Sequence, residues 1–511
     1  MKKKLSEFIH AIEAVDIRGT GDPEILDLVY DSRQVQPGAL FFALSGLHTD
    51  GERFIPQAIA SGARAIIHSQ PLFRYEDGIV YIQTADPRLA MSPIANAFYG
   101  EPSSDLTVIG ITGTEGKSTT VSLVFQLLRL CGKKAGFIST VEYCTSTEVL
   151  PNPEHQTTPE ALTIHKKLAE MRDNDLDYAV IEASSHGLSK RTNRLGDVLF
   201  DAAILTNVTH EHLEFHGTHE QYKSDKANLF RALDTHTHIK KGKPVPSFGV
   251  VNEEDSSAPY FRSATEKPVY GFSTWALPRK GIGASAIESD RTGSSFTLTY
   301  GGQSIPARIN LPGAFNVYNA LAAAITVSRL LEKPMEEVVS LLPHLMPVKG
   351  RMTSIDEGQP FEVLVDYAHT PSSFQAIFPS LRKRITGKII SAFGSGGERD
   401  LIKRPEQGRI ACEYSDIVIL TDEDPRGENP MTLLSMIAEG CTGKIEGENL
   451  FLIPDRSTAV RKAISLAKPG DLVLLLGKGH ENSIIYRDHT ISYDECAEAR
   501  AALNEAGWRI Q

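Results

Sequence analysis

Cysteine is scarce in this chain of 511 residues, and the five that occur do not fall into pairs. An odd number of cysteines without paired spacing argues against a disulfide framework of the secreted type. We therefore expect reduced thiols and a cytoplasmic protein. The cysteines are Cys131, Cys144, Cys412, Cys441 and Cys496.

A secretory leader and apolar segments of membrane length are also missing. The chain opens with a short run of lysines and a polar, amphipathic segment over residues 6–16, where a signal peptide would have an apolar core. No apolar run approaches the length of a membrane span. The sequence therefore predicts neither a signal peptide nor a membrane partner.

Long basic tracts are absent, and acidic residues outnumber basic ones to give a net charge of −11. This balance argues against extensive nucleic-acid binding, although local basic clusters can still hold small anions. What is present is a globular composition, with 41% apolar and 23% charged residues. At roughly 150 residues per domain, the length suggests about three domains.

We expect the first two domains to be α/β units over residues 1–102 and 103–345. The first is small and contains a strand, a helix and a linker, predicted at 39–44, 54–61 and 102–105. In the second, apolar strands alternate with helical patterns, which predicts a mainly parallel sheet with helices on both faces. Its strands are predicted at 106–112, 178–183 and 202–208, with a helix at 316–331 and an antiparallel or looped insert at 240–305.

Residues 346–511 form the third predicted domain. Four apolar strands recur there, separated by helical patterns, and each ends in polar or glycine residues. This is typical of a doubly wound, Rossmann-like sheet, whose ligands bind at the carboxyl ends of the strands. The predicted strands lie at 363–367, 388–393, 417–421 and 472–477.

The most informative segment for function is Gly-Ile-Thr-Gly-Thr-Glu-Gly-Lys-Ser-Thr at 110–119. It follows an apolar strand and opens an amphipathic helix that stops before Gly132. Backbone N–H groups and the helix dipole at such a turn favour a polyphosphate, while lysine adds positive charge and serine can ligate Mg²⁺. The alternative is a glycine-rich turn that merely ends a strand. We predict ATP binding by Gly113, Thr114, Glu115, Gly116, Lys117, Ser118 and Thr119.

Acidic and histidine side chains follow two further strands of the central domain. Glu182 ends one strand, and His212 follows the next. Because the carboxyl ends of parallel strands share an edge with the phosphate loop, these residues are predicted to ligate metal held by ATP. The alternatives are a solvent-exposed strand end, or zinc binding by the crowded His210, His212, His216 and His219, which no neighbouring cysteine supports.

These motifs resemble the Mur ligase family, which joins amino acids to a UDP-muramoyl precursor of bacterial peptidoglycan. Gly-Thr-Glu-Gly-Lys-Ser is followed by Thr-Thr-Pro from Thr157, Glu-Ala-Ser-Ser-His-Gly-Leu from Glu182, and Tyr222 with Lys226. The most discriminating matches are Asp-Tyr-Ala-His-Thr-Pro from Asp366 and Gly-Lys-Gly-His-Glu from Gly477. The matches run from residue 31 to 481 and are closest to the members that add the third residue of the peptide.

The resemblance implies an ATP-dependent acid–amino-acid ligase of cell-wall synthesis that works through an acyl phosphate. It implies a catalytic set of Lys117, Glu182, His212 and Lys226, with Ser118, Glu182, His212 and Lys226 around Mg²⁺. In this family the lysine matching Lys226 is carbamylated, which turns a cation into an anion able to position a second Mg²⁺. From sequence alone, Lys226 would be a surface lysine on a helix.

Further roles follow from the same resemblance. The nucleotide would contact Asn316, Asn319, Arg351 and Asp366. The UDP-muramoyl dipeptide would contact Ser32 through its uridine part, and Thr157, Thr158, Ser184 and Arg194 through its peptide, with Arg191 as the alternative to Arg194. The incoming amino acid would contact Arg399, Asp424, Arg426, Gly477 and Glu481, where arginines suit carboxylates and a glutamate suits an ammonium.

The amino-acid pocket gives two conflicting signals. Members that add diaminopimelate carry Asp-Asn-Pro-Arg, whereas this chain has Glu423-Asp-Pro-Arg. Arg426 would pair with the far carboxylate of diaminopimelate, and Asp424 would favour the side-chain ammonium of lysine or ornithine. We expect diaminopimelate, with lysine and ornithine as alternatives, and a monomeric enzyme. A folylpolyglutamate-type ligase and a nucleotide-dependent regulator are the other functions to test.

Overall fold

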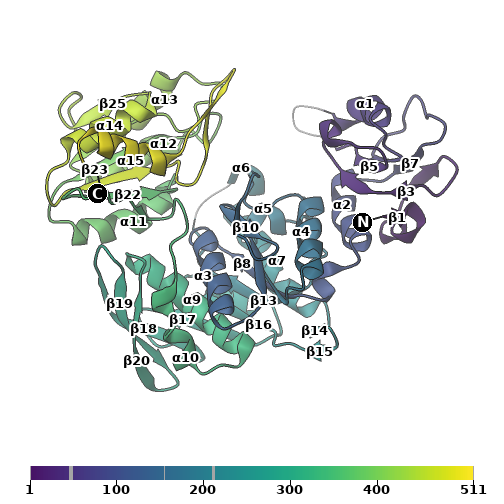
Figure 1. Cartoon of the computed structure of the whole chain (residues 1–511), viewed down its shortest axis with the longest axis horizontal. Helices are drawn as coiled ribbons and strands as arrows, with labels where there is room; N and C mark the ends of the chain where they lie inside the picture. The colour runs from purple at the N-terminus through teal and green to yellow at the C-terminus, as the bar shows by residue number, and fades with distance from the viewer. Residues whose placement is uncertain (1, 45–49, 155, 210–212, 510–511) are drawn as a thin grey trace.

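The computed structural model describes residues 2–44, 50–154, 156–209 and 213–509. The chain folds into three α/β units, each built on its own sheet (Figure 1). In this view the N-terminal and C-terminal units stand apart from each other on the same side of the middle unit. The predicted three-domain α/β fold is therefore confirmed, while the exact boundaries remain predictions.

The N-terminal unit is a five-stranded sheet in the order β2-β7-β6-β5-β4, parallel except for β2. β5 and β6 are buried along their whole length because helices cover both faces of the sheet and paired strands flank both edges. The predicted linker is a short 3-10 helix, Pro102–Ser104, with Ser103 fully buried. The elements are β1 (Lys3–Lys4), β2 (Asp16–Arg18), β3 (Glu24–Ile25), β4 (Asp27–Val29), β5 (Ala39–Phe42), α1 (Ile55–Ala60), β6 (Ala65–His68), β7 (Val80–Gln83) and α2 (Pro87–Phe98).

The middle unit has an eleven-stranded sheet in the order β11-β10-β9-β12-β8-β13-β16-β17-β18-β19-β20. The central run β9-β12-β8-β13-β16-β17-β18 is parallel, and the strands at both ends of the sheet pair in antiparallel fashion. The strands are β8 (Thr107–Thr112), β9 (Ala135–Ile138), β10 (Glu142–Cys144), β11 (Leu150–Pro151), β12 (Tyr178–Glu182), β13 (Phe200–Leu205), β16 (Phe248–Asn252), β17 (Val269–Ser273), β18 (Gly281–Ser289), β19 (Ser294–Tyr300) and β20 (Gln303–Ile309), with a separate hairpin of β14 (Ile239–Lys240) and β15 (Lys243–Pro244).

Helices cover both faces of this sheet, as the alternating pattern predicted. Alternate residues of β8 point to opposite faces, so Ile109 packs with α3 and α9 while Val108 packs with α4 and α7. The insert prediction was partly wrong, because β16 and β17 are parallel strands that extend the sheet. The helices are α3 (Lys117–Leu130), α4 (Ala161–Asp173), α5 (Ser185–Leu188), α6 (Leu213–His216), α7 (His219–Arg231), α8 (Ala258–Arg262), α9 (Ala314–Leu331) and α10 (Met335–Val339).

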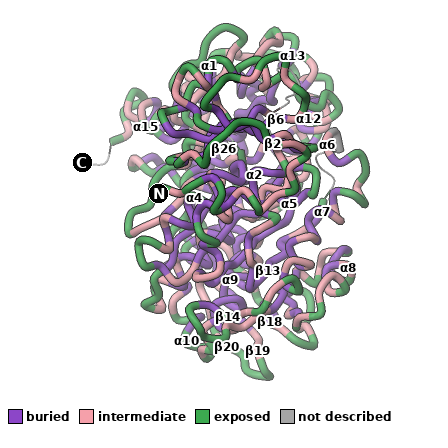
Figure 2. Tube along the Cα trace, turned by 90° about the vertical axis from the view of Figure 1, so that its right-hand side faces the viewer, coloured by how far each residue is buried: buried purple, intermediate pink, exposed green. Residues whose placement is uncertain are grey.

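Helix α9 is long and apolar enough to cross a membrane, so the expectation that no run approaches this length was wrong. Its mean hydropathy is 1.2 over 18 residues, and 72% of the segment is buried inside the protein. Figure 2 shows buried residues concentrated in the sheets and in α9. The apolar character of α9 thus serves a central core position against α3.

The C-terminal unit has a six-stranded sheet in the order β21-β22-β26-β23-β24-β25. All its pairs are parallel except β21–β22, and helices cover both faces, which confirms the doubly wound prediction. Its strands are β21 (Thr353–Ser354), β22 (Glu362–Asp366), β23 (Ile389–Phe393), β24 (Ile417–Leu420), β25 (Leu450–Leu452) and β26 (Leu472–Leu476), and its hairpin is β27 (Ser483–Ile485) with β28 (Thr490–Ser492). Its helices are α11 (Pro371–Arg384), α12 (Lys403–Tyr414), α13 (Pro430–Ala438), α14 (Arg456–Leu466) and α15 (Glu495–Glu505).

Candidate active site

The loop between β8 and α3 is held in place by the residues that follow β13. Thr206 Oγ1 donates a hydrogen bond to the Glu115 carbonyl at 2.6 Å, and the Asn207 carbonyl accepts from the Thr114 N–H at 2.8 Å. Gly113 has φ 149°, and a Cβ there would lie 1.8 Å from Thr206 Oγ1. Only glycine fits this position, so the close approach of the loop to Thr206 depends on Gly113.

At the start of α3, the loop presents its N–H groups and a cationic side chain to the same edge of the sheet. Gly116 caps the helix in the left-handed conformation, with φ 83°. Lys117 Nζ donates to the Thr114 carbonyl at 2.6 Å, which holds the ammonium over the loop. A helix N-terminus with a lysine held over the preceding loop has the charge distribution that binds a polyphosphate.

Ser118 and Glu182 lie side by side, as their positions at neighbouring strand ends predicted. Ser118 Oγ donates to Glu182 Oε1 at 3.1 Å, and Glu182 Oε2 accepts the Thr140 N–H at 2.8 Å. Both side chains are almost fully buried. A hydroxyl and a carboxylate are hard oxygen donors, so this pair fits Mg²⁺. The predicted ligand His212 lies outside the described residues, as do His210 and Glu211.

Lys226 is buried beside the phosphate loop, which overturns the reading of a surface lysine that the sequence alone favoured. Its side chain is 1% exposed, and Nζ donates to the Gly113 carbonyl at 2.6 Å. The same ammonium lies 4.4 Å from the centre of the Tyr222 ring, whose hydroxyl is 3.0 Å from Thr114 Oγ1. Helix α7 therefore aims Lys226 at the loop that is predicted to hold ATP.

A cavity of about 290 Å³ lies next to these side chains. Thr158 Oγ1 donates to the Glu182 carbonyl at 2.8 Å and accepts the Ser184 N–H at 2.9 Å, which fixes that wall to the end of β12. The cavity thus brings together six of the residues predicted from sequence, with four others. Its lining consists of Lys117, Gln156, Thr157, Thr158, Ser184, Ser185, His186, Arg194, Tyr222 and Lys226.

Arg194 lines this cavity, whereas Arg191 points elsewhere. Arg194 donates to the Thr158 carbonyl at 2.8 Å and to Glu160 Oε1 at 2.9 Å. Glu160 also accepts from Arg88 of the N-terminal unit at 2.9 Å, so it links two units at the cavity. Arg191 instead donates to the Phe215 carbonyl. The role of Glu160 was missed, since no sequence signal joins residues 88, 160 and 194.

Residues of the C-terminal unit reach the phosphate loop. Arg351 Nη2 donates to Ser118 Oγ at 3.3 Å, and its guanidinium lies 4.7 Å from the centre of the Tyr367 ring. Thr370 donates to Glu115 Oε1 at 3.3 Å, so the phosphate loop contacts the C-terminal unit. These contacts place Arg351 beside Ser118 at the start of α3, while its contact with the nucleotide remains a prediction.

The other residues predicted to bind the nucleotide lie near the contact between the C-terminal unit and the start of α3. Asn319 packs on the loop, since Thr120 donates to its Oδ1 at 3.2 Å, and Asn316 lies one turn earlier on α9. The Asp366 carboxylate accepts the Met352 and Ala368 N–H groups, both at 2.7 Å. Burial raises the pKa of Asp366, against the lowering effect of Arg351. Ser32 does not line the cavity and donates to Gln57 at 3.2 Å within the N-terminal unit.

The predicted amino-acid pocket contains a buried cation that the sequence analysis missed. Lys478 is fully buried, and its Nζ contacts Asp424 Oδ1 at 3.0 Å and Glu481 Oε2 at 2.5 Å. Asp424 Oδ1 also accepts the Ile485 N–H at 3.0 Å. The negative charge of Asp424 is therefore already paired inside the protein.

Around this pair, the other predicted residues differ in burial. Arg426 is half-buried, and its Nε forms no hydrogen bond within the described structure, while Arg399 is exposed. Gly477 has φ 102° and lies against Glu423, whose pKa burial raises. The pocket thus combines two arginines with a lysine-bridged pair of carboxylates.

The histidines considered as an alternative zinc site do not form one among the residues that the structure describes. His216 is buried and uses both ring nitrogens, with Asp225 Oδ2 at 2.8 Å and Ser185 Oγ at 3.0 Å. Among the described residues, the one group of three metal-binding side chains lies elsewhere, at Asp201, His236 and His238.

Together, the loop, the acidic strand end and the cavity define a protein that binds a nucleoside triphosphate at the edge of a parallel sheet. Family models match three segments: "Mur ligase family, catalytic domain" at 24–99, "Mur ligase middle domain" at 111–327 and "Mur ligase, glutamate ligase domain" at 350–479. The chain belongs to the Mur ligase family. The predicted family and the class of ATP-dependent ligase are thereby confirmed.

Individual relatives match nearly the whole chain. The UDP-N-acetylmuramyl-tripeptide synthetase of Treponema denticola is 55% identical over 98% of both chains. The UDP-N-acetylmuramoyl-L-alanyl-D-glutamate–2,6-diaminopimelate ligase of Geobacillus kaustophilus is 37% identical over 95% of this chain and 96% of that protein. The chain is also similar to a solved structure of a UDP-N-acetylmuramoyl-L-alanyl-D-glutamate–2,6-diaminopimelate ligase, with a TM-score of 0.63 and 26% identity. The match covers 99% of this chain and 100% of that structure.

Proposed function

We propose that the protein adds meso-diaminopimelate to UDP-N-acetylmuramoyl-L-alanyl-D-glutamate at the expense of ATP. The observation that carries this proposal is the single cavity that joins Lys117 and Lys226 of the phosphate edge to Thr157, Thr158 and Arg194. A cationic wall suits both a carboxylate and the γ-phosphate, which must meet for the acid to be activated. The activities in the names of the two relatives agree with this chemistry.

The reaction needs two transfers. A carboxylate oxygen of the dipeptide bonds to the γ-phosphorus while the bond from that phosphorus to ADP breaks, which gives an acyl phosphate. The amine of the amino acid then bonds to the acyl carbon, phosphate leaves, and the amine loses a proton. Lys117 neutralises charge on the transferred phosphoryl group, and Arg194 orients the carboxylate from its position on Thr158 and Glu160.

Ser118 and Glu182 would hold Mg²⁺, with His212 as a third candidate. When bound, the ion neutralises phosphate charge and aligns the phosphoryl group. Lys226 would be carbamylated by CO₂: the ammonium loses one proton, its nitrogen bonds to the carbon of CO₂, and that nitrogen then loses a second proton. The modified nitrogen keeps one N–H for the Gly113 carbonyl, and the new carboxylate replaces an ammonium that would repel a cation at the loop. Its burial beside that loop supports this assignment.

The preference for diaminopimelate rests on the pairing of Asp424. A free carboxylate at this position would attract the side-chain ammonium of lysine or ornithine. Here the carboxylate is paired with Lys478, which is fully buried. Lys478 also pairs with Glu481, so this cluster keeps one negative charge. Arg426 and Arg399 add positive charges, which suit the second carboxylate of diaminopimelate. We assign Gly477 and Glu481 to the same pocket.

The wider setting is part of the proposal. We propose domain boundaries at 102/103 and 345/346, with uridine bound at Ser32. We also propose that the enzyme is a cytoplasmic monomer that serves cell-wall growth, cell shape and cell division. The Asp-Ser-Arg turn at residues 31–33 of the N-terminal unit favours a UDP-muramoyl substrate over the substrate of a folylpolyglutamate-type ligase. A non-ligase regulator would have no use for an amine pocket.

The test is phosphate release from ATP by the purified protein. We expect release to require both the UDP-muramoyl dipeptide and an amino acid, and diaminopimelate to be incorporated ahead of lysine and ornithine in competition. Equal hydrolysis with the dipeptide omitted would refute the ligase reading for this substrate. Preferential incorporation of ornithine or lysine would refute only the choice of amino acid.

A further inference from the structure

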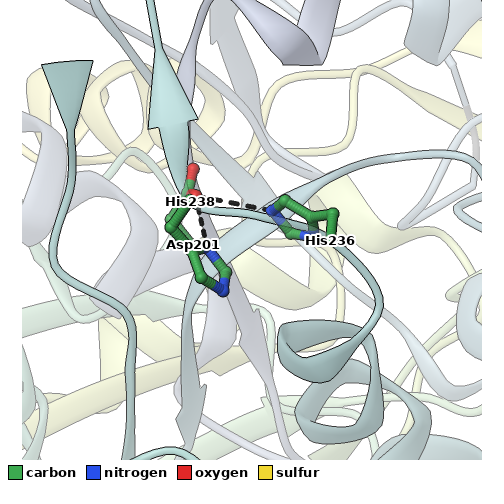
Figure 3. Close-up of side chains that lie close together, drawn as sticks. All are labelled: Asp201, His236 and His238. Atoms are coloured by element: carbon green, nitrogen blue, oxygen red, sulfur yellow. Dashed lines mark hydrogen bonds and ion pairs between the residues drawn. The ribbon is translucent and has the colours of Figure 1, made fainter. Parts of the chain in front are cut away.

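At the end of the middle sheet opposite to the phosphate loop, one aspartate and two histidines converge (Figure 3). Asp201 is the second residue of β13, and the other end of this strand leads into Thr206 and Asn207 at the loop. His236 and His238 follow the 3-10 helix Ala232–Asp234, which continues directly from α7. One ligand atom from each residue lies within 4.8 Å of the others.

The carboxylate of Asp201 is oriented by its protein contacts. Its side chain is fully buried, and Oδ2 accepts the Val108 N–H at 2.9 Å and lies 3.2 Å from Lys240 Nζ. Oδ1 is thereby directed at the two imidazoles, with His238 Nδ1 at 2.8 Å and His236 Nε2 at 3.5 Å. One oxygen is thus held by the protein and the other faces the histidines.

The protons of His238 present a choice. Its Nε2 lies 2.8 Å from the Leu233 carbonyl, which can only accept, so Nε2 carries a proton. A neutral ring then directs a bare Nδ1 at a carboxylate oxygen 2.8 Å away. Two lone pairs at that distance repel each other, so either a second proton or a cation must lie between them.

His236 favours a cation. Its Nε2 is buried without a hydrogen-bond partner in the described part of the chain, and its side chain is only 9% exposed. This nitrogen lies near the same Asp201 oxygen, and the two imidazole centres are 4.3 Å apart. A proton on His238 satisfies only that ring, whereas a metal ion accepts lone pairs from both rings and from the carboxylate.

We propose that Asp201, His236 and His238 bind a divalent transition-metal ion of the Zn²⁺ class, with an open fourth position. Two imidazoles and a carboxylate suit Zn²⁺ and not the oxygen-seeking Mg²⁺ or Ca²⁺. Ligand bonds of about 2.0–2.2 Å in tetrahedral geometry put donor atoms roughly 3.3–3.5 Å apart. Asp201 Oδ1 and His236 Nε2 already lie 3.5 Å apart, whereas the 2.8 Å contact with His238 Nδ1 would lengthen by about 0.5 Å when the ion binds. The Nε2–H contact of His238 with a carbonyl is the usual support of a metal-bound histidine.

Lys240 completes the site without competing for it. Its ammonium also donates to the Ser103 carbonyl at 2.7 Å, so it stays on the Oδ2 side of the carboxylate. The ion would join β13 to the chain just after α7, the helix that carries Lys226. Its role would be to stabilise the attachment of this helix, at a distance from the reacting groups.

The test is Co²⁺ and Zn²⁺ binding by the chelator-treated full chain, with excess Mg²⁺ present to fill the ATP site. We expect one Co²⁺ per chain with the intense visible bands of four-coordinate cobalt, and Zn²⁺ should displace it. Zn²⁺ should raise the thermal midpoint by about 5 °C. His236→Gln and His238→Gln should lose both effects.

His489→Gln is the matched control, because His489 forms an exposed pair with Asp488 at 2.7 Å and belongs to no group of three metal-binding side chains among the described residues. This variant should keep the cobalt bands and the shift in midpoint. Absence of the bands in the unmodified protein would overturn the proposal and leave a proton between His238 and Asp201. Bands that persist in His236→Gln would overturn it as well.

Discussion

The ammonium of Lys226 donates to the carbonyl of Gly113 at 2.6 Å, although 113 residues separate the two in the chain. This contact ties α7 to the phosphate loop and buries a cation where ATP and Mg²⁺ are proposed to bind. An ammonium next to a divalent ion is unfavourable, whereas a carbamate there is favourable. The proposed carbamylation therefore accounts for a lysine that is buried beside the proposed ATP and Mg²⁺ site.

Lys226→Ala should lower kcat by roughly a hundredfold to a thousandfold, because it removes a preorganised charge beside the phosphoryl group. A short carboxylic acid should restore part of the activity by occupying the vacated space as an anion. Steady-state kinetics with and without the acid make the measurement. Lys223→Ala on the same helix is the control and should stay active. Full activity of Lys226→Ala would contradict the carbamate proposal.

Gly113→Ala should weaken ATP binding and destabilise the protein by about 1–3 kcal/mol through overpacking. The added Cβ would lie 1.8 Å from Thr206 Oγ1, which must then leave the Glu115 carbonyl. Gly132→Ala is a matched control, because Gly132 also has a positive φ, 76°, but has open space around it. Calorimetry and nucleotide titration should show the larger loss in Gly113→Ala, and equal losses would mean that only backbone strain matters.

The amino-acid pocket can be tested through its charges. Arg426→Ala should lower kcat/KM for diaminopimelate by roughly 10- to 100-fold, the loss expected for one charge-assisted hydrogen bond, and should change lysine addition little. Asp424→Asn should leave the order of preference unchanged, since Lys478 already neutralises that carboxylate. A change in the order of preference in Asp424→Asn would show that Asp424 contacts the incoming amino acid.

Arg194→Ala should raise KM for the UDP-muramoyl dipeptide by about tenfold or more while leaving KM for ATP nearly unchanged. Arg194 lines the cavity and holds the Thr158 carbonyl, whereas Arg191 stacks on Phe215 and lies outside the lining. Arg191→Ala is therefore the control. The reverse result, with Arg191→Ala impaired, would assign the substrate contact to Arg191.

Much of this arrangement could be predicted from sequence because it depends on local patterns. Apolar runs gave β8 and β12, and the rule that parallel strands end at one edge placed Ser118 next to Glu182. Burial of Lys226 and Lys478 was not predictable, since it depends on contacts with residues 113 and 424, far away in the chain. The proposed metal site at Asp201 was not predictable for a similar reason. A single acidic residue in an apolar strand indicates a metal site only once the positions of the histidines after α7 are known.

Acid should weaken the attachment of the N-terminal unit through His165. This histidine of α4 is fully buried against α2, where its Nε2 lies 3.2 Å from Ser92 Oγ, and burial lowers its pKa to about 3. Between pH 6.5 and 3, the unfolded chain binds a proton at this position and the folded chain does not. The free energy of unfolding should therefore fall with decreasing pH by roughly 1.4 kcal/mol per pH unit from this residue alone.

His165→Leu should remove that contribution, so its stability should depend less steeply on pH than that of the unmodified protein. Thermal midpoints measured from pH 7 to pH 4.5 provide the comparison. His344→Gln, at an exposed histidine, is the control and should keep the original slope. Because Leu also removes the partner of Ser92, the absolute stability of His165→Leu says little, and the slope is the quantity to compare. Identical slopes in all three proteins would mean that His165 becomes protonated without loosening the contact between α2 and α4.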